Sequence, residues 1–294
     1  MTALIRLVLI AMLAAGFNAQ AANAEFPDDV TRWQDISVPP ETSRGDRAVW
    51  SYAANYSRHE WRVVAEAGQI HAQLKGREQA AKGERPDFTP QADKFRRASA
   101  FFAVDDGWLV AFNQGEFGAA LYWFSADGQQ NYKISDHQVV EFFVLADGIH
   151  AIEGLAHGVH LKGMPVGRGS IVRIARPSQD VHWQASSVIP LPGAPFSVAV
   201  RRDGSALVTL WDRLVSLGKD GKITTLLADA PWDGMYPNSS VLSADQQKLY
   251  IGMRQYVAEL DIPTANLRFL LPSPAFLNAI PEKDQQAIRK QADR

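Results

Sequence analysis

Residues 201–227, RRDGSALVTLWDRLVSLGKDGKITTLL, contain two Asp-Gly turn signals and three apolar runs. Asp-Gly between apolar runs is a strong hairpin signal, because glycine readily adopts a positive φ. The stretch therefore predicts three consecutive antiparallel strands. Together with the apolar residues just before Arg201, it predicts one complete four-stranded unit.

The same pattern recurs along the chain. Four hairpins with a tight turn built on Asp are predicted at 99–114, 140–154, 196–211 and 239–254. A second hairpin follows each of them, at 120–134, 170–186, 213–227 and 256–271. Equivalent positions in the second hairpins are Tyr122, Val172, Val215 and Val257, so the repeat is about 42 to 50 residues long. Two hairpins per repeat of this length are typical of β-propeller blades.

The repeat predicts an all-β fold and a β-propeller domain over 25–272, with clear blades over 99–271. A further hairpin at 60–74 indicates a fifth blade, closed by strands from both ends of the chain, and the total is five or six blades. A stack of unrelated hairpins in a sandwich or an open sheet is the alternative. The polar segment 75–94 is predicted to be a loop or linker, and the tail 273–294 to be helical after Pro281.

The first 24 residues are typical of a secretory signal peptide. Arg6 supplies the positive charge, Leu7 to Phe17 form an apolar run too short to span a bilayer, and Ala22-Asn23-Ala24 offers a cleavage site after Ala24. A buried N-terminal helix is the alternative. We therefore expect a protein of the periplasm or the extracellular medium, with no membrane anchor after cleavage.

Composition excludes several classes of protein. The chain has no cysteine, which excludes disulfides, thiol catalysis, cysteine-ligated zinc and a lipoprotein anchor. A net charge of −2 gives no reason to expect a nucleic-acid partner. We expect a monomer that binds a protein or a small molecule.

Loops from different blades are predicted to converge on one funnel face, where propellers usually carry their sites. The expected ligand- or partner-binding residues on this face are Glu116, His137, Arg168, Trp211, Arg213, Trp232, Arg254 and Tyr256. Tryptophan, tyrosine and arginine are the residues enriched in binding hot spots. The same aromatic residues could instead pack the blades together or stack on a sugar.

One loop holds a candidate metal-ligand set. Glu153, His157 and His160 supply a carboxylate and two imidazoles, which zinc or iron accepts. Histidines exposed on an irregular loop, without a metal, are the alternative. Glu116 lies between two glycines and could bind a cation, or form a salt bridge to an arginine of the funnel.

The segment 236–252, YPNSSVLSADQQKLYIG, resembles a stretch of the gluconolactonase-type six-bladed propellers, and the blade pattern over 99–271 also resembles the NHL-repeat proteins. The resemblance implies that Asn238 is a ligand of a central divalent metal. Ser239 stands where that family has glycine, and no clear counterpart of its N-terminal glutamate ligand is found. With Glu116 and Asp233, Asn238 would hold Ca²⁺ or Zn²⁺ and activate water against an ester.

Two functions follow from these patterns. The first is an exported propeller that binds a partner without turnover, since no complete catalytic constellation, nucleophile elbow or phosphate loop is found. The alternative is a metal-dependent hydrolase of the lactonase or esterase kind. Neither a cofactor nor a catalytic residue is fixed by the sequence alone.

Overall fold

The computed structural model describes residues 26–75, 81–156, 167–178 and 181–292. The predicted signal peptide, His157 and His160 lie outside these ranges. The described chain is all-β with few helices, and its antiparallel strands form separate sheets in chain order.

Three sheets have four strands each. The first contains β4 (Ala100–Val104), β5 (Gly107–Asn113), β6 (Ala119–Ser125) and β7 (Asn131–Ser135). The second contains β8 (Val139–Leu145), β9 (Gly148–Leu155), β10 (Arg168–Ala175) and β11 (Gln184–Leu191). The third contains β12 (Pro195–Val200), β13 (Ala206–Leu210), β14 (Leu214–Leu217) and β15 (Ile223–Leu227).

The fourth sheet has a fifth strand. It contains β16 (Ser239–Leu242), β17 (Lys248–Gly252), β18 (Val257–Asp261), β19 (Asn266–Leu271) and, at its outer edge, β1 (Gln34–Ile36). All eight hairpins predicted from the repeat are therefore present. Turn residues and apolar alternation are both local signals, which is why they locate these strands correctly.

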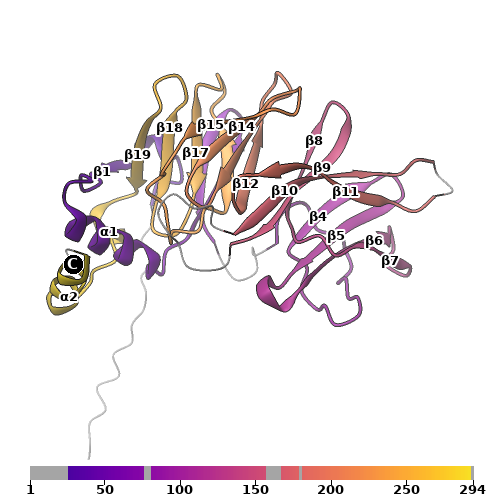
Figure 1. Ribbon diagram of the computed structural model, residues 1–294, viewed down its shortest axis with the longest axis horizontal. Helices are drawn as coiled ribbons and strands as arrows, with labels where there is room; N and C mark the ends of the chain where they lie inside the picture. Colours follow the sequence, from indigo (N-terminus) through magenta and orange to yellow (C-terminus); the bar gives the residue numbers. More distant parts are fainter. Residues whose placement is uncertain (1–25, 76–80, 157–166, 179–180, 293–294) are drawn as a thin grey trace, which may run out of the picture.

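Neighbouring sheets pack face to face, and this buries both faces of the middle sheets. In β13 every residue is buried, and successive side chains point to opposite faces. Leu207 packs toward the fourth sheet and Val208 toward the second. The first strands β4, β8, β12 and β16 contact one another in sequence, so the stacked sheets follow one another in chain order (Figure 1).

The hairpin predicted as a fifth blade contains only two strands, β2 (Trp61–Glu66) and β3 (Gln69–Leu74). It packs against β16 and β17. The sequence had suggested that strands from both ends of the chain complete this hairpin into a blade. The N-terminal strand β1 instead pairs with β19 in the fourth sheet. The 3-10 turn η1 (Val30–Arg32) contacts β3.

The segment 81–98, which we call the cap segment, covers one face of the first sheet. The sequence predicts a loop or linker there, and it forms no regular strand, but its apolar side chains are buried. Phe95 stacks on Phe112 of β5 at 5.4 Å between ring centroids, and the hydroxyl of Tyr122 donates to the carboxylate of Asp93. The cap segment thus shields the face of the first sheet that points away from the second sheet.

Lys82, at the start of the cap segment, reaches the place where the first strands of the sheets meet. Its ammonium lies 2.7 Å from Glu141 Oε2 on β8 and 2.6 Å from the carbonyl oxygen of Phe196 on β12. The backbone of Lys82 is held in this position by hydrogen bonds with the backbone of Ser99 and of Phe101. Gly83 has φ +85°, and a Cβ there would lie 2.1 Å from Phe101 O, so only glycine permits the turn.

Two helices pack together at one end of the molecule, α1 (Arg44–Asn55) and α2 (Glu282–Ala292) (Figure 1). The C-terminal helix was predicted, whereas α1 was not. Trp50 anchors α1 by stacking on Tyr256 at 5.5 Å and meeting Phe269 edge-on at 5.1 Å. Gly45 permits close contact with α2, because a Cβ there would lie 3.2 Å from Arg289 Cβ.

In the described part of the chain, no helix has the length and apolar character needed to cross a membrane.

A nearly buried carboxylate holds the three inner strands of the fourth sheet, β17, β18 and β19, together. Glu259 on β18 accepts from Arg268 Nη2 at 2.6 Å and from Lys248 Nζ at 3.1 Å. Burial opposes its ionisation, but the hydrogen bonds from Arg268, Lys248 and Tyr250 outweigh it and hold the pKa of Glu259 below its ordinary value. Ionised Glu259 therefore stabilises the folded state.

Acid is expected to remove this contribution. A carboxyl whose pKa is lowered on folding stabilises above its unfolded pKa, near 4.5, and that stability is lost as the pH falls through its folded pKa. Urea unfolding of the full chain between about pH 6 and pH 3 should show a steeper loss than in Glu259→Gln, by at most about 1.4 kcal/mol per pH unit. Glu66→Gln, on an exposed position of β2, is the control, and identical slopes for all three proteins would contradict the assignment.

Candidate functional site

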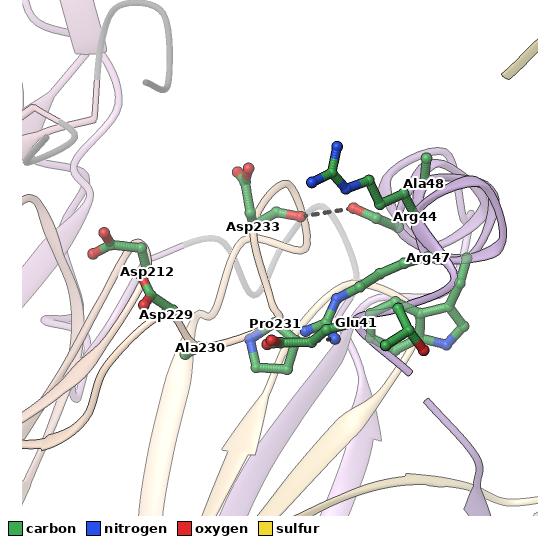
Figure 2. A pocket seen from close by; sticks show the side chains of 12 residues that line it. Glu41, Arg44, Arg47, Ala48, Asp212, Asp229, Ala230, Pro231 and Asp233 are labelled. Atoms are coloured by element: carbon green, nitrogen blue, oxygen red, sulfur yellow. Dashed lines mark hydrogen bonds and ion pairs between the residues drawn. The ribbon is translucent and has the colours of Figure 1, made fainter. Parts of the chain in front are cut away.

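A cavity of about 840 Å³ lies between α1 and two loops that follow strands of the third sheet (Figure 2). This volume falls in the range of small-molecule pockets. One wall is helical and the other is formed by loops. The lining residues are Glu41, Thr42, Arg44, Arg47, Ala48, Trp50, Ser51, Asp212, Asp229, Ala230, Pro231 and Asp233.

The helical wall is basic. Arg44 is the first residue of α1 and Arg47 follows three positions later, so the two lie on neighbouring positions of the helix surface. Arg47 lies 3.9 Å from the exposed Glu41 carboxylate. The side chain of Arg44 forms no hydrogen bond or ion pair with any residue in the described ranges. Its guanidinium extends from the helix on the side of the cavity (Figure 2).

The loop wall is acidic. Asp212 accepts two bonds from its neighbour Arg213, at 2.8 and 2.7 Å. These bonds, with a smaller contribution from Asp229, raise the pKa of Arg213. The amide of Ala230 donates to the carbonyl of Asp212 at 2.7 Å, which ties the two loops together. Figure 2 shows Asp212, Asp229 and Asp233 on this wall, opposite the arginines.

A hydrogen bond joins the two walls. The hydroxyl of Ser51 on α1 donates to the carbonyl oxygen of Asp233 at 3.2 Å. The Asp233 carboxylate itself has no hydrogen bond or ion pair with the described part of the chain. The Ser51 hydrogen bond therefore connects the helix and the loop that form the two walls of the cavity.

A group of aromatic rings comes from segments that flank the acidic residues in sequence. Trp211 lies 5.7 Å from both Phe196 and Tyr236, measured between ring centroids. The guanidinium of Arg254 stacks 4.4 Å above the Tyr236 ring. Arg254 also donates to Asn55, the last residue of α1, at 2.7 Å. Trp211 and Arg254, both predicted as partner-binding residues, thus meet around Tyr236.

Backbone strain gathers in the same region. Asp229, Tyr236 and Gln255 have φ of +48°, +52° and +72°, although none is glycine. Such conformations cost on the order of 1–3 kcal/mol each and cluster at functional sites, where the surrounding structure enforces them. Gln255 is held by bonds to His59 O and Phe276 O, both at 2.7 Å.

Two of the predicted binding residues support the site from within. Trp232 is fully buried and donates its indole N–H to Leu210 O at 3.0 Å. Tyr256 is buried beneath Trp50, and burial raises the pKa of Tyr256 to about 12. These rings pack the loop and the helix in place, which is the alternative that the sequence had left open for the aromatic residues.

Other predicted residues lie elsewhere. Glu116, on the 3-10 turn η3 (Gly115–Phe117), and Arg168 line a separate cavity of about 550 Å³. His137 contacts the hydroxyls of Ser135 at 2.8 Å and Ser187 at 3.1 Å. Glu153 accepts from Ser170 at 2.8 Å. The predicted funnel residues therefore occupy several distinct surroundings.

The proposed metal ligands are also spread out. Asp233 lines the large cavity, Glu116 the separate one, and Asn238 donates to Glu60 Oε1 at 3.1 Å and to Trp61 O at 3.0 Å. The ammonium of Lys75 lies 2.6 Å from the same Glu60 oxygen. Across the described ranges, no group of three or more His, Asp or Glu side chains is close enough to share a metal ion.

Sequence reasoning missed the basic wall of the cavity. Arg44 and Arg47 belong to a helix that the repeat pattern does not predict. Ser43 before this helix and Asp46 in its first turn are nevertheless typical of the start of a helix. Asp212 and Asp229 lie in loops that were predicted to open on the functional face. Their carboxylates become informative only when the helix is placed opposite them.

No protein-family model matches the chain. A search of curated proteins also finds no match.

Solved structures offer distant likenesses. The chain is similar to a streptogramin B lyase, with 18% identity over 64% of this chain and 59% of that one and a TM-score of 0.43. It is similar to a gluconolactonase from Xanthomonas campestris, with 16% identity over 70% and 64% of the two chains and a TM-score of 0.40. It is also similar to a chain of a nidogen/laminin complex, with 11% identity over 63% of this chain and 67% of that one and a TM-score of 0.38.

The match spans about three fifths of the lyase. The generic resemblance to propeller proteins, the gluconolactonase type among them, is confirmed at this level.

Proposed function

We propose that the chain is an exported, propeller-type binding protein that holds a partner in the cavity between α1 and the acidic loops, without turnover. The observation that carries this proposal is the cavity of about 840 Å³ with oppositely charged walls. Charged groups that line one cavity without pairing across it are available to a ligand, and their desolvation is offset only when a ligand supplies partners.

The aromatic residues beside the cavity extend the proposed surface. Tyr236 is 38% exposed and is fixed between Trp211 and Arg254. Rigid aromatic side chains next to an arginine are the residues that contribute most to binding at interfaces. The strained backbone of Asp229 and Tyr236 keeps both side chains in place before a partner arrives, which lowers the entropy cost of binding.

Site-specific photo-cross-linking tests this function. A benzoylphenylalanine in place of Ala48, which lines the cavity, should yield an adduct in cells that produce the full chain. The same residue in place of Val188, which is 45% exposed on β11, is the control and should yield none. Adding Asp229→Asn and Asp233→Asn to the Ala48 variant should remove the adduct, because these carboxylates face the partner.

The adduct also distinguishes binding from turnover. A partner recovered by mass spectrometry with its own mass unchanged agrees with binding alone. Equal adducts at positions 48 and 188, or a chemically modified partner, would contradict the proposed function.

A metal-dependent hydrolase remains the second proposal, and one contact favours it. Glu60, the residue before β2, brings a carboxylate to Asn238, the amide that the gluconolactonase resemblance singles out. Lys75 already neutralises that carboxylate, which favours the binding proposal. A melting temperature that falls with chelator and rises with Ca²⁺ or Zn²⁺ would favour the hydrolase instead.

A further inference from the structure

The charges of the large cavity divide into those that are paired internally and those that are not. Arg47 is 3.9 Å from Glu41, and Arg213 is bonded at 2.7 Å to Asp212. Each pair satisfies itself at its own wall. Within the described ranges, neither Asp229 nor Asp233 has a side-chain hydrogen bond or ion pair within 4 Å, and the same is true of Arg44.

The unpaired charges are separated across the cavity. The loop wall carries the carboxylates of Asp212, Asp229 and Asp233 against the one guanidinium of Arg213, whereas the helical wall has an excess guanidinium at Arg44. A matching ligand needs more than one cationic group for the loop wall and one anionic group for the helix. A simple anion or a simple cation would satisfy only one wall.

A second cavity continues the first. It has a volume of about 480 Å³, lies between α1 and α2, and shares Ala48, Ser51 and Asp233 with the large cavity. Tyr52, 42% exposed, and Ile288 of α2 also line it. A ligand that enters the large cavity therefore has a partly apolar path along α1 in which a longer chain can continue, as a polypeptide would and a compact metabolite would not.

We infer that the occupant is the carboxyl-terminal end of a basic polypeptide. This inference rests on the proposed binding function and names its ligand. The terminal carboxylate pairs with Arg44, and lysine or arginine side chains pair with Asp229 and Asp233. Arginine is well suited to the first role, because its planar guanidinium can bond a carboxylate with two parallel N–H groups.

Isothermal titration with two matched probes tests the inference. The probes are trilysine with a free carboxylate and trilysine with a carboxyl-terminal amide, each titrated into the full chain. We expect the free acid to bind with a dissociation constant below about 1 mM and about tenfold more tightly than the amide, as the loss of one charge-assisted hydrogen bond requires.

The protein variants complete a thermodynamic cycle. The affinity of the Arg44→Gln variant for the free acid should be about tenfold lower, equal to the affinity for the amide. Its affinity for the amide should be the same as that of the parent protein. The double variant Asp229→Asn, Asp233→Asn should bind both probes with an affinity at least about tenfold lower than that of the parent. Arg97→Gln, an exposed arginine that lines a different cavity, is the control and should bind both probes as the parent does.

Several outcomes would overturn the inference. Absence of trilysine binding is one, and equal binding of acid and amide to the parent protein is another. Spermidine binding as tightly as trilysine would identify a polyamine site in which no carboxylate is recognised. A failed titration together with a position-48 adduct to a different class of partner would refute this ligand while leaving the proposed function intact. Unchanged melting temperatures of the variants exclude misfolding as the cause.

Discussion

Replacing Trp61 by alanine is expected to lower the free energy of unfolding by about 4 kcal/mol, a larger loss than we expect from any other single substitution. Trp61 is completely buried, and its indole N–H donates to Gln255 O at 2.9 Å. Its ring contacts those of Phe26, Trp33 and Phe276. Alanine would remove packing that joins the N-terminal segment, the β2–β3 hairpin and the residues after β19.

Urea unfolding and the melting temperature measure this loss, which corresponds to a shift of roughly 8–16 °C in a chain of this size. Trp211→Ala is the matched control, because it makes the same chemical change at a half-buried ring beside the cavity. It should cost less than half as much. Equal losses for the two variants would show that Trp61 does not hold these parts together.

Replacing Lys82 by methionine is expected to cost about 3 kcal/mol, because it leaves Glu141 without its counter-ion in a poorly solvated place. The side chains of Lys82 and Glu141 are only 18% and 24% exposed. Burial lowers the pKa of Lys82, and the charge of Glu141 and its hydrogen bond oppose that effect. The Val198 amide, at 3.3 Å, would be the remaining donor to Glu141.

The double variant Lys82→Met, Glu141→Leu separates the pair from its parts. Removing both charges should restore most of the stability, to within about 1 kcal/mol of the parent, since a well-packed apolar pair often replaces a buried ion pair at little cost. Urea unfolding of the parent, both single variants and the double variant gives the coupling energy. Additive losses would mean that the two residues do not act as a pair.

Most of the sheet structure could be predicted from the sequence, because hairpins are encoded locally. Asp-Gly turns such as Asp203-Gly204 and the alternation of apolar residues on either side require no information from elsewhere in the chain. The register within each four-stranded sheet follows from those turns. The turns do not predict which strand completes each sheet, since β1 pairs with a strand more than 230 residues later.

Helix α1 could not be predicted, because distant residues stabilise it. Its sequence contains Gly45 and several residues of modest helix propensity. It is held by Trp50 against Tyr256 and Phe269, which lie in the last quarter of the chain. Tertiary packing thus outweighs local preference.

The candidate site was partly predictable for the same reason. The meeting of Trp211 and Arg254 follows from the repeat, since both follow the second strand of a unit. The opposition of Arg44 to Asp229 and Asp233 depends on α1 and could not be derived from spacing. Trp232 and Tyr256 were found in the right loops, but their burial is a property of the packed helix.

The pairing of β1 with β19 also sets an order of events during biosynthesis. Gln34 emerges from the ribosome more than 230 residues before its partner Leu271. The first strand must therefore wait, unpaired, while the intervening hairpins form, and pairing across so many residues is slow. A nascent chain that stops short of β19 leaves the edge of the fourth sheet open and prone to self-association, so the synthesis of β19 closes and protects that edge.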